Sequence, residues 1–369
     1  MSSGHTLTRI AVLSVVAAMI AGACSSDSGD PQNSAPETVS YGGNAAEAVV
    51  VDDEYEALVD ASLATASWAG AGAEVSYFGN EFDVTDFGAV ADDGESDSAA
   101  FNDAVQAARS EGGGVVTVPE GAFLITDSVQ LVSRVVLRGA GRASRLELDF
   151  GDQSGYGIRA TGTADSEWTY LDTDIASGTS SLNLPFDAAT EVVEIEQDNT
   201  DEIITKPEWD VDWGEGSEGE LVVLDGLNDS GAFESMVPVL SSYSTDRNVR
   251  VRAVQPVRDV GVEDLTIVRM DEGYGHTISL RFTQNAWVNN VVSTRTSFAH
   301  VGVEQSINCT IGDSVFHDAT DFGDGGRAYG VSLARHTTGC AVVNNALYEL
   351  RHALIIQLGA SGNVIAYNH

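Results

Sequence analysis

The chain has 369 residues, and its 56 acidic side chains outnumber 18 basic ones, which gives a formal net charge of -38. This length allows one large domain or two ordinary domains with a sizeable core. So negative a surface repels nucleic acids and anionic membranes, and we therefore exclude a nucleic-acid-binding function.

The first 23 residues have the features of an export signal. The apolar run from Ile10 to Ala23 is too short to span a bilayer permanently. The small residues before Cys24 resemble the cleavage site of bacterial lipoproteins, in which this cysteine becomes the lipidated N-terminus. A plain signal peptide with an incidental cysteine is the alternative. Residues 24–75 form a tether and N-terminal extension, so we expect an exported chain that is lipid-anchored at the cell envelope or secreted.

Residues 76–167 contain one amphipathic helix followed by short strands. Asp97 is placed to cap a helix whose apolar residues, among them Phe101 and Val105, share one face. Gly112 and its neighbours end that helix by allowing left-handed backbone, and apolar strand segments separated by turns follow. A short helix before a ladder of short strands predicts a β-helix whose open end the helix covers.

Residues 168–260 are acidic and contain alternating strands that do not keep a solenoid period. We interpret this stretch as a β-rich insertion that leaves one coil and rejoins the next. Residues 261–369 then repeat one apolar-polar-polar-apolar rhythm about every 21 to 26 residues, with one longer coil, as expected of a β-solenoid. The last coil stops at His369, and we therefore expect the solenoid to be truncated at its C-terminus. The repeats are "VEDLTI", "VNNVVS", "IGDSVF", "VNNALY" and "VIAYNH".

The segments "VTDFGAVADDGESDSAAFNDAVQAA", "GGGVVTVPEGAFLI" and "VVLRGAG" together resemble the N-terminal signature of the pectate-lyase superfamily. The resemblance covers about 60 residues. It implies an all-β, right-handed single-stranded parallel β-helix with an N-terminal cap helix. Members include pectate lyases, polygalacturonases, rhamnogalacturonases, alginate epimerases and phage tailspikes. The signature is specific for fold and weak for activity, because it carries no catalytic group that all members share.

The second strand of each repeat places polar residues on the outer face. Strand alternation predicts a column of Arg281, Glu304 and Gln357, interrupted by Ala334, with His300 also facing outward. Small residues beside this column predict a shallow groove for an extended chain. The same alternation predicts that the apolar residues of these strands point into the core: Ile278, Leu280, Val301, Val303, Val331, Leu333, Leu354 and Ile356.

A groove with His300, Glu304, Arg281 and Arg327 suits proton abstraction beside a substrate carboxylate. Arginine or Ca²⁺ would neutralise that carboxylate. The acids Asp318, Asp321 and Asp324 offer hard oxygen ligands for such an ion, although their spacing is not a recognised calcium loop. An ordinary surface ion pair between Arg281 and Glu304 is the alternative interpretation.

The sequence therefore predicts an exported protein that cleaves a uronate-containing extracellular polysaccharide by β-elimination or hydrolysis. A non-catalytic glycan-binding module, similar to an adhesin or tailspike, is the alternative. The paired aspartates of polygalacturonases, the aspartate cluster with arginine of pectate lyases, and the Asp-Pro-His-Glu motif of epimerases are all missing. Ca²⁺ is the one cofactor that the sequence suggests, and the pattern of residues defines no oligomeric state. Cys309 and Cys340 fit either two core residues or a disulfide.

Overall fold

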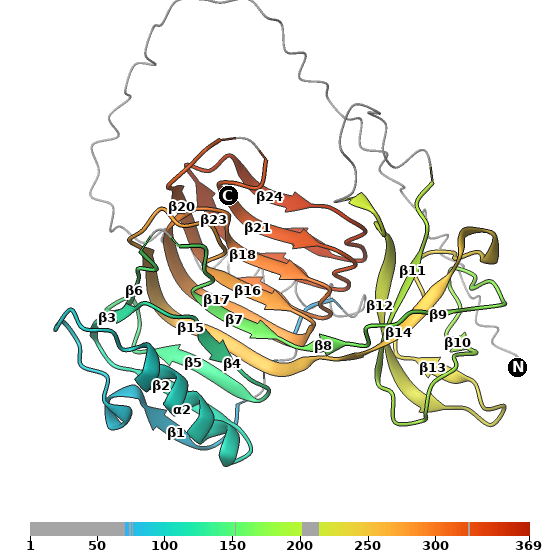
Figure 1. Cartoon of the computed structure of the whole chain (residues 1–369), viewed down its shortest axis with the longest axis horizontal. Coiled ribbons are helices and arrows are strands. Elements are labelled where there is room, and N and C mark those ends of the chain that lie inside the picture. The colour runs from blue at the N-terminus through green and yellow to red at the C-terminus, as the bar shows by residue number, and fades with distance from the viewer. Residues whose placement is uncertain (1–70, 74, 76, 152, 201–213, 324) are drawn as a thin grey trace, which may run out of the picture. The chain divides into compact units, whose positions relative to one another are not determined.

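The computed structural model describes residues 71–369 except 74, 76, 152, 201–213 and 324 (Figure 1). The predicted signal peptide, Cys24 and most of the tether lie outside these residues. Within the described part of the chain, no helix combines the length and apolar character required to cross a bilayer.

The chain winds as a right-handed parallel β-helix in which two parallel sheets enclose the core, and this confirms the predicted fold class (Figure 1). The larger sheet contains β1 (Glu81–Asp83), β2 (Gly114–Val118), β3 (Gly121–Ile125), β5 (Val135–Gly139), β6 (Ser144–Leu148), β15 (Val257–Arg269), β17 (Thr283–Thr296), β19 (Thr310–Gly312), β20 (Val315–Ala319), β22 (Ala341–Val343), β23 (Ala346–Tyr348) and β25 (Val364–Ala366). The smaller sheet, called the groove sheet below, contains β4 (Val129–Leu131), β7 (Ile158–Thr161), β16 (Ile278–Arg281), β18 (Ala299–Glu304), β21 (Tyr329–Ala334) and β24 (His352–Ile356).

The long strands of the larger sheet bend at left-handed residues that stack from coil to coil. Asp264, Asn290, Asp313 and Asn344 all have φ between 50° and 56°. The amide of Asn290 donates to the carboxylate of Asp264 at 2.7 Å, and Asn344 donates to Asp313 at the same distance. Asn and Asp tolerate this backbone region better than other non-glycine residues. These bends explain why polar residues interrupt each repeat.

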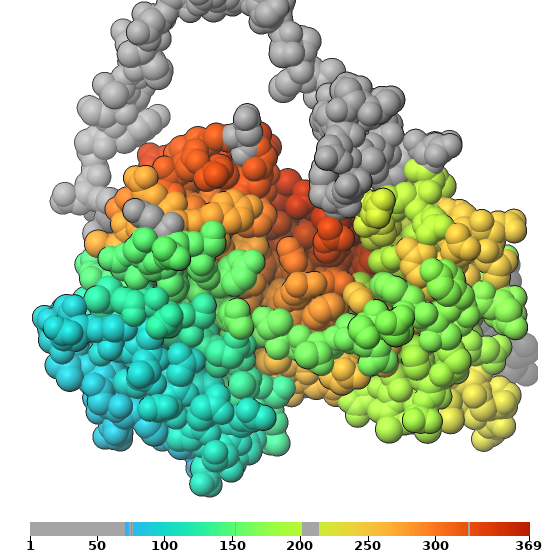
Figure 2. Space-filling view, viewed as in Figure 1, coloured from blue at the N-terminus to red at the C-terminus, as the bar shows by residue number. Residues whose placement is uncertain are grey.

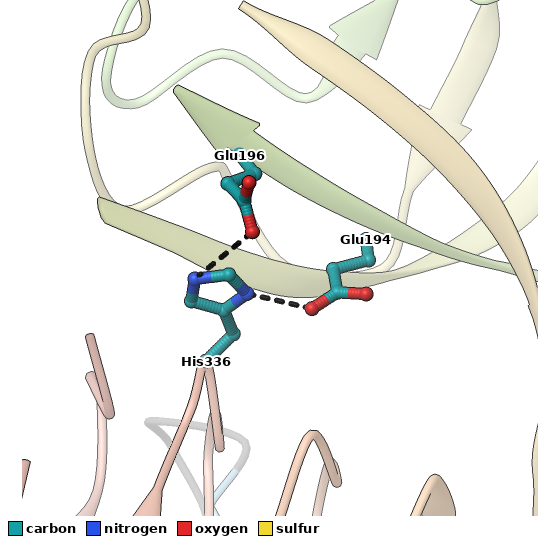
Figure 3. A group of neighbouring side chains, drawn as sticks. All are labelled: Glu194, Glu196 and His336. Atoms are coloured by element: carbon teal, nitrogen blue, oxygen red, sulfur yellow. Dashed lines mark hydrogen bonds and ion pairs between the residues drawn. The ribbon is translucent and has the colours of Figure 1, made fainter. Parts of the chain in front are cut away.

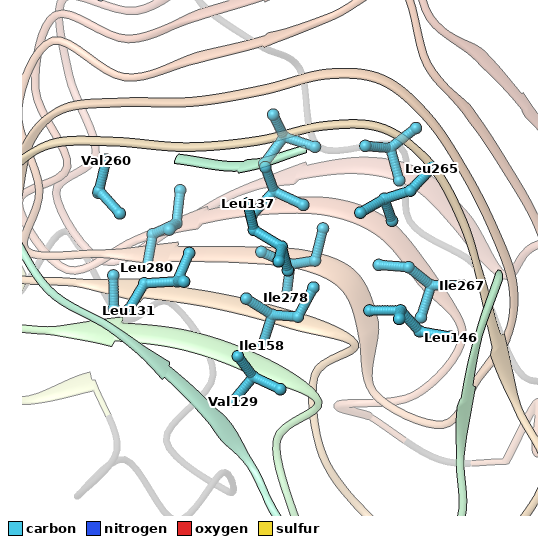
Figure 4. Packing of buried hydrophobic residues seen from close by; sticks show 14 of the residues in the cluster. Val129, Leu131, Leu137, Leu146, Ile158, Val260, Leu265, Ile267, Ile278 and Leu280 are labelled. Carbon is cyan, nitrogen blue, oxygen red and sulfur yellow. The ribbon is translucent and has the colours of Figure 1, made fainter. Parts of the chain in front are cut away.

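The buried core lies between the two sheets and follows the predicted alternation (Figure 4). Figure 4 shows Ile278 and Leu280 of β16 pointing toward the same interior as Leu265 and Ile267 of β15. Ile356 is an exception with 47% exposure, because β24 is the edge strand of the groove sheet. Cys309 and Cys340 are free thiols buried in this core, so they are core residues rather than a disulfide.

Helix α2 (Ser98–Ser110) and the short helix η2 (Val84–Phe87) lie at the N-terminal end of the coils. Phe101 and Val105 of α2 are fully buried in the main core cluster, as predicted. The helix begins after Asp97, but the predicted capping hydrogen bond is wrong. The carboxylate of Asp97 instead accepts from the backbone N–H groups of Val90 and Leu124. This carboxylate therefore joins the N-terminal turn to β3, and burial raises the pKa of Asp97.

A third, antiparallel sheet forms the predicted insertion and has its own hydrophobic core. Its strands start at Thr163 and end at Gln255, so the insertion lies slightly earlier than the predicted range 168–260. The 3-10 helix η4 (Thr245–Arg247) precedes its last strand. The strands are β8 (Thr163–Ala164), β9 (Thr169–Tyr170), β10 (Ser181–Leu182), β11 (Val192–Gln197), β12 (Glu218–Leu227), β13 (Phe233–Ser235) and β14 (Arg250–Gln255).

Candidate functional site

The outer face of β16, β18 and β21 forms the floor of the candidate site, and Figure 2 shows this face hollowed between the turns and the insertion. Arg281 pairs in register with Glu304, and Glu304 pairs with Ala334, so these three positions of the predicted column lie side by side on adjacent strands. The guanidinium of Arg281 lies 4.0 Å from the carboxylate of Glu304 and is 50% exposed. Small residues, Ser279, Gly302 and Ser332, occupy the centre of the floor. We call this surface the trough.

His300 does not face the trough, and its predicted outward position is wrong. Its side chain is fully buried, with Nδ1 2.7 Å from the hydroxyl of Ser293 and Nε2 3.1 Å from the carbonyl oxygen of Asp318. The ring stacks on Phe316, a member of the core cluster. Burial lowers the pKa of His300 to about 3. The residue follows the short turn between β17 and β18, where its ring folds under the strand instead of continuing the alternation.

A row of neighbouring rings borders the trough at the N-terminal ends of its strands; the first two contacts are stacked and the last two are tilted. The rings belong to consecutive coils, and their centroids lie 5.6, 4.3, 5.7 and 5.2 Å apart in the order Tyr156, His276, Phe298, Tyr329 and His352. We call these five residues the aromatic row. Burial lowers the pKa of His276 to about 4, so its ring is neutral near pH 7. Its Nδ1 is buried without a hydrogen-bond partner among the described residues.

The floor and the row fit together because Gly302 has no side chain. A Cβ atom at Gly302 would lie 2.5 Å from the imidazole ring of His276, far inside van der Waals contact. The small residue therefore lets the ring lie flat over β18. The periodicity of the repeats does not reveal that His276 forms part of this border.

The loop before β21 brings Arg327 to the edge of the aromatic row. Its guanidinium lies 5.5 Å from the ring centroid of Tyr274 and 2.7 Å from the carboxylate of Asp321. Tyr274 stacks on Phe298 at 5.1 Å and is 41% exposed. The structure therefore places Arg327 beside the row, on another side of the trough from the Arg281–Glu304 pair.

The predicted calcium ligands do not assemble into one site in the described structure. Asp318 contacts His317 and Thr294 and shares a hydrogen bond with Glu349, which raises the pKa of Glu349. Asp321 is paired with Arg327, and Asp324 lies outside the described residues. A calcium ion needs six to eight oxygen ligands. We therefore derive no chemical step through Ca²⁺.

One group of His and Glu side chains does gather, between β11 of the insertion and the turn after β21 (Figure 3). His336 Nδ1 lies 2.7 Å from Glu194, and its Nε2 lies 2.7 Å from the carbonyl oxygen of Gly216 and 3.9 Å from Glu196. Arg252 pairs with Glu194 at 2.6 Å. We call Glu194, Glu196, His336 and Arg252 the docking network.

The docking network does not fit a metal site. The carboxylate of Glu194 already forms an ion pair with Arg252 and accepts a hydrogen bond from the amide of Gln305. Arg250 forms an ion pair with Glu196. Burial would raise the pKa of Glu194, but the hydrogen bond and charge of His336, together with Arg252, hold it below its ordinary value. The network instead fastens the insertion to the coils. Glu194 and His336 are 142 residues apart in sequence, so no local pattern could have predicted their contact.

The structure resembles two solved phage tailspikes in its fold. The tailspike gp61 of Pseudomonas phage phi297 superposes with a TM-score of 0.62 at 16% identity, covering 79% of this chain and 52% of that protein. The tailspike gp49 of Pseudomonas phage LKA1 gives a TM-score of 0.56 at 17% identity, covering 78% and 50%. The chain thus spans about half the length of these proteins. No curated protein sequence matches the chain.

The sequence also matches one family model over residues 82–324, a stretch that starts in the N-terminal strands and ends in the loop before β21. That family is described as rhamnogalacturonase A/epimerase, pectate lyase-like. The match covers more than half of the chain, so the protein belongs to this pectate lyase-like family of parallel β-helix proteins.

Proposed function

We propose that this chain binds an acidic polysaccharide along the trough and cleaves it by β-elimination. The observation that carries the proposal is the incompletely neutralised guanidinium of Arg281 on a rigid floor of small residues. Its nearest carboxylate is 4.0 Å away, and its hydrogen bonds go to the neutral amide of Gln305. Arg159 of β7 is likewise bonded to a neutral amide, that of Gln130. Arginine pairs well with carboxylates, which points to an anionic chain.

The family and the fold support a polysaccharide as the partner. In the proposed reaction Arg281 binds the uronate carboxylate, which makes the neighbouring C–H more acidic. Glu304 accepts that proton, the C–O bond at the β position breaks, and water protonates the departing sugar oxygen. Glu304 is the only carboxylate in the six strands of the groove sheet. Hydrolysis generally uses two carboxylates, so elimination is favoured.

A second candidate is binding without cleavage. The observation that favours it is the placement of His300 and His276, both buried, so that neither imidazole reaches the open face as a ready acid or base. In that case the trough and its aromatic border hold a glycan, and Arg281 contributes affinity only.

The test is to incubate the exported full-length chain with a panel of polyuronates, in salt, with calcium or a chelator. Ultraviolet absorbance from unsaturated ends, lost in Arg281→Ala and Glu304→Gln, is the expected result. New reducing ends without unsaturation would contradict elimination and indicate hydrolysis. Binding without any product would support the second candidate. Arg145→Ala, a change in an exposed ion pair on another sheet, is the matched control.

We also propose that the chain is exported through residues 1–23 and lipid-anchored at Cys24. The sequence pattern around that cysteine supports this proposal. The mass of the exported chain used in the same assay tests it, because lipidation adds acyl chains to an N-terminus at Cys24. A mature chain of unmodified mass, or one beginning elsewhere, would contradict the anchor.

A further inference from the structure

A chain of hydrogen bonds leads from the trough into the docking network. The guanidinium of Arg281 donates through Nε and Nη2 to Oε1 of Gln305, at 3.3 and 3.2 Å. Nε2 of Gln305 in turn donates to the carboxylate of Glu194 at 2.8 Å. Arg281 is half exposed, whereas Gln305 and Glu194 are both buried. The side chain of Gln305 therefore joins the open face of the coils to the insertion.

The turn after β18 fixes where the side chain of Gln305 begins. Gln305 has a left-handed backbone with φ of 46°, and its N–H donates to the carbonyl oxygen of Arg335 at 2.8 Å. Phe282, at the same turn of the previous coil, has φ of 48°, and its ring centroid lies 5.2 Å from the guanidinium of Arg281. Non-glycine residues keep such a backbone only where the surrounding structure holds it. The backbone holds one end of this side chain, and Glu194 holds the other.

The charges on the two sides of Gln305 fix the direction of its amide. Burial opposes ionisation of Glu194, but His336 and Arg252 hold its pKa below the ordinary value, so the carboxylate is charged. An ionised carboxylate only accepts hydrogen bonds, and a guanidinium only donates them. One orientation of the amide satisfies both neighbours, with the nitrogen toward Glu194 and the oxygen toward Arg281. Glu194 thus determines which atom of Gln305 the arginine contacts.

We propose that Glu194 and Gln305 are positioning residues: Glu194 of the insertion orients the amide of Gln305, whose oxygen holds the guanidinium of Arg281 in one orientation without neutralising it. A carboxylate at this place would hold the guanidinium equally well but would cancel its charge. The neutral amide leaves the charge and the remaining N–H groups of Arg281 for an anionic ligand. The role in ligand binding rests on the proposed function, whereas the orientation of Arg281 is a property of the free chain.

The first test measures the reaction of Arg281 with phenylglyoxal in the full chain without ligand, followed by peptide mapping and mass spectrometry. A guanidinium held by hydrogen bonds reacts more slowly than a free one. Glu194→Gln removes the requirement for one amide direction, and Gln305→Met removes the acceptor itself. We expect each change to accelerate modification of Arg281 several-fold. Gln305→Met leaves Glu194 with both of its charged partners, so it tests the inference even where Glu194→Gln fails to fold.

Two matched controls alter buried groups of the insertion that do not contact Gln305. The carboxylate of Glu220 accepts from the hydroxyl of Tyr243, and the amide of Gln197 donates to Glu218. Glu220→Gln and Gln197→Met should leave the modification rate of Arg281 unchanged. Equal acceleration in the controls would mean that loosening of the insertion alone is responsible, and would overturn the inference. An unchanged rate in Gln305→Met, or in folded Glu194→Gln, would overturn it as well.

The second test separates orientation from charge. The double variant Glu194→Gln, Gln305→Glu restores a donor and an acceptor in the original direction, so the modification rate of Arg281 should return toward that of the wild type. Its affinity for an oligogalacturonate, measured by calorimetry, should stay several-fold weaker, because a carboxylate now neutralises Arg281. Gln305→Met alone should also weaken binding several-fold, although it leaves the charge in place. A fast modification rate in the double variant would contradict the role of amide direction.

The two readouts distinguish failure of this inference from failure of the proposed function. If Arg281→Ala weakens binding while Gln305→Met changes neither rate nor affinity, the positioning role is wrong and the proposed function stands. If Arg281→Ala leaves the affinity unchanged while Gln305→Met still accelerates modification, the proposed ligand site is wrong and the positioning of Arg281 stands.

Discussion

The imidazole of His336 lies between two acceptors in the docking network. Both ring nitrogens face oxygen atoms, Glu194 on one side and the carbonyl of Gly216 on the other, and the side chain is 2% exposed. The buried Glu194 in turn depends on donors from His336, Arg252 and Gln305.

His336→Ala is therefore expected to lower the free energy of unfolding by about 3 kcal/mol, because it leaves a buried carboxylate short of a partner. Urea denaturation at pH 7 measures this loss. Arg258→Ala, which removes a surface ion pair between β15 and Glu191 of the insertion, should cost about 1 kcal/mol or less. Similar losses in the two variants would show that the docking network contributes no more than a surface pair.

At the scale of single elements, two neutral buried histidines lie at the starts of strands β16 and β18. His276 precedes β16 and His300 lies in β18, and burial lowers their pKa values to about 4 and about 3. In the unfolded chain both titrate near 6.5, so between pH 6.5 and about 4 the unfolded state binds protons that the folded state does not. Their contribution to stability is full above pH 6.5 and is lost as the pH falls through this window.

We expect the free energy of unfolding to fall by roughly 1.4 kcal/mol per pH unit for each histidine below pH 6. Urea midpoints measured from pH 7.5 to 4.5 test this slope. His276→Phe keeps a ring in the aromatic row and should remove about half of the pH dependence. A slope that His276→Phe leaves unchanged would mean that His276 titrates normally in the folded chain.

The elements themselves were largely predictable from the sequence. Strand alternation places Ile278, Val301 and Val331 in the core correctly, because the middle of a strand has a fixed period of two. Alternation fails at His300, because a residue next to a tight turn can direct its side chain under the strand. The cap at Asp97 fails for a similar reason, since distant backbone donors of Val90 and Leu124 take its carboxylate.

At the scale of the whole molecule, the periodic repeats were enough to predict a β-helix with an insertion. The contacts between the insertion and the coils were not predictable, because Glu194 in β11 and His336 in the turn after β21 lie far apart in the chain. The candidate site was predicted in part. The Arg281–Glu304 column follows from register, whereas the aromatic row depends on residues at strand starts, where periodicity carries little information.

The net charge of -38 also affects the proposed binding of an acidic polysaccharide. Long-range repulsion opposes the approach of an anionic chain, and salt screens it over about 8 Å at physiological ionic strength. The proposed contact of a carboxylate with Arg281 is a short-range ion pair, which salt screens less than the long-range repulsion. Binding measurements therefore belong at moderate salt, where repulsion is screened and short ion pairs persist.

The most direct test of the account is the affinity of the wild-type chain for an acidic oligosaccharide, compared by calorimetry with Arg281→Ala and Arg145→Ala. A hydrogen-bonded charge contributes about 1.5–3 kcal/mol, and 1.4 kcal/mol is tenfold in Kd. The account predicts binding at least about tenfold weaker in Arg281→Ala and unchanged in Arg145→Ala. Equal affinity of the wild type and Arg281→Ala would place the ligand somewhere other than the trough.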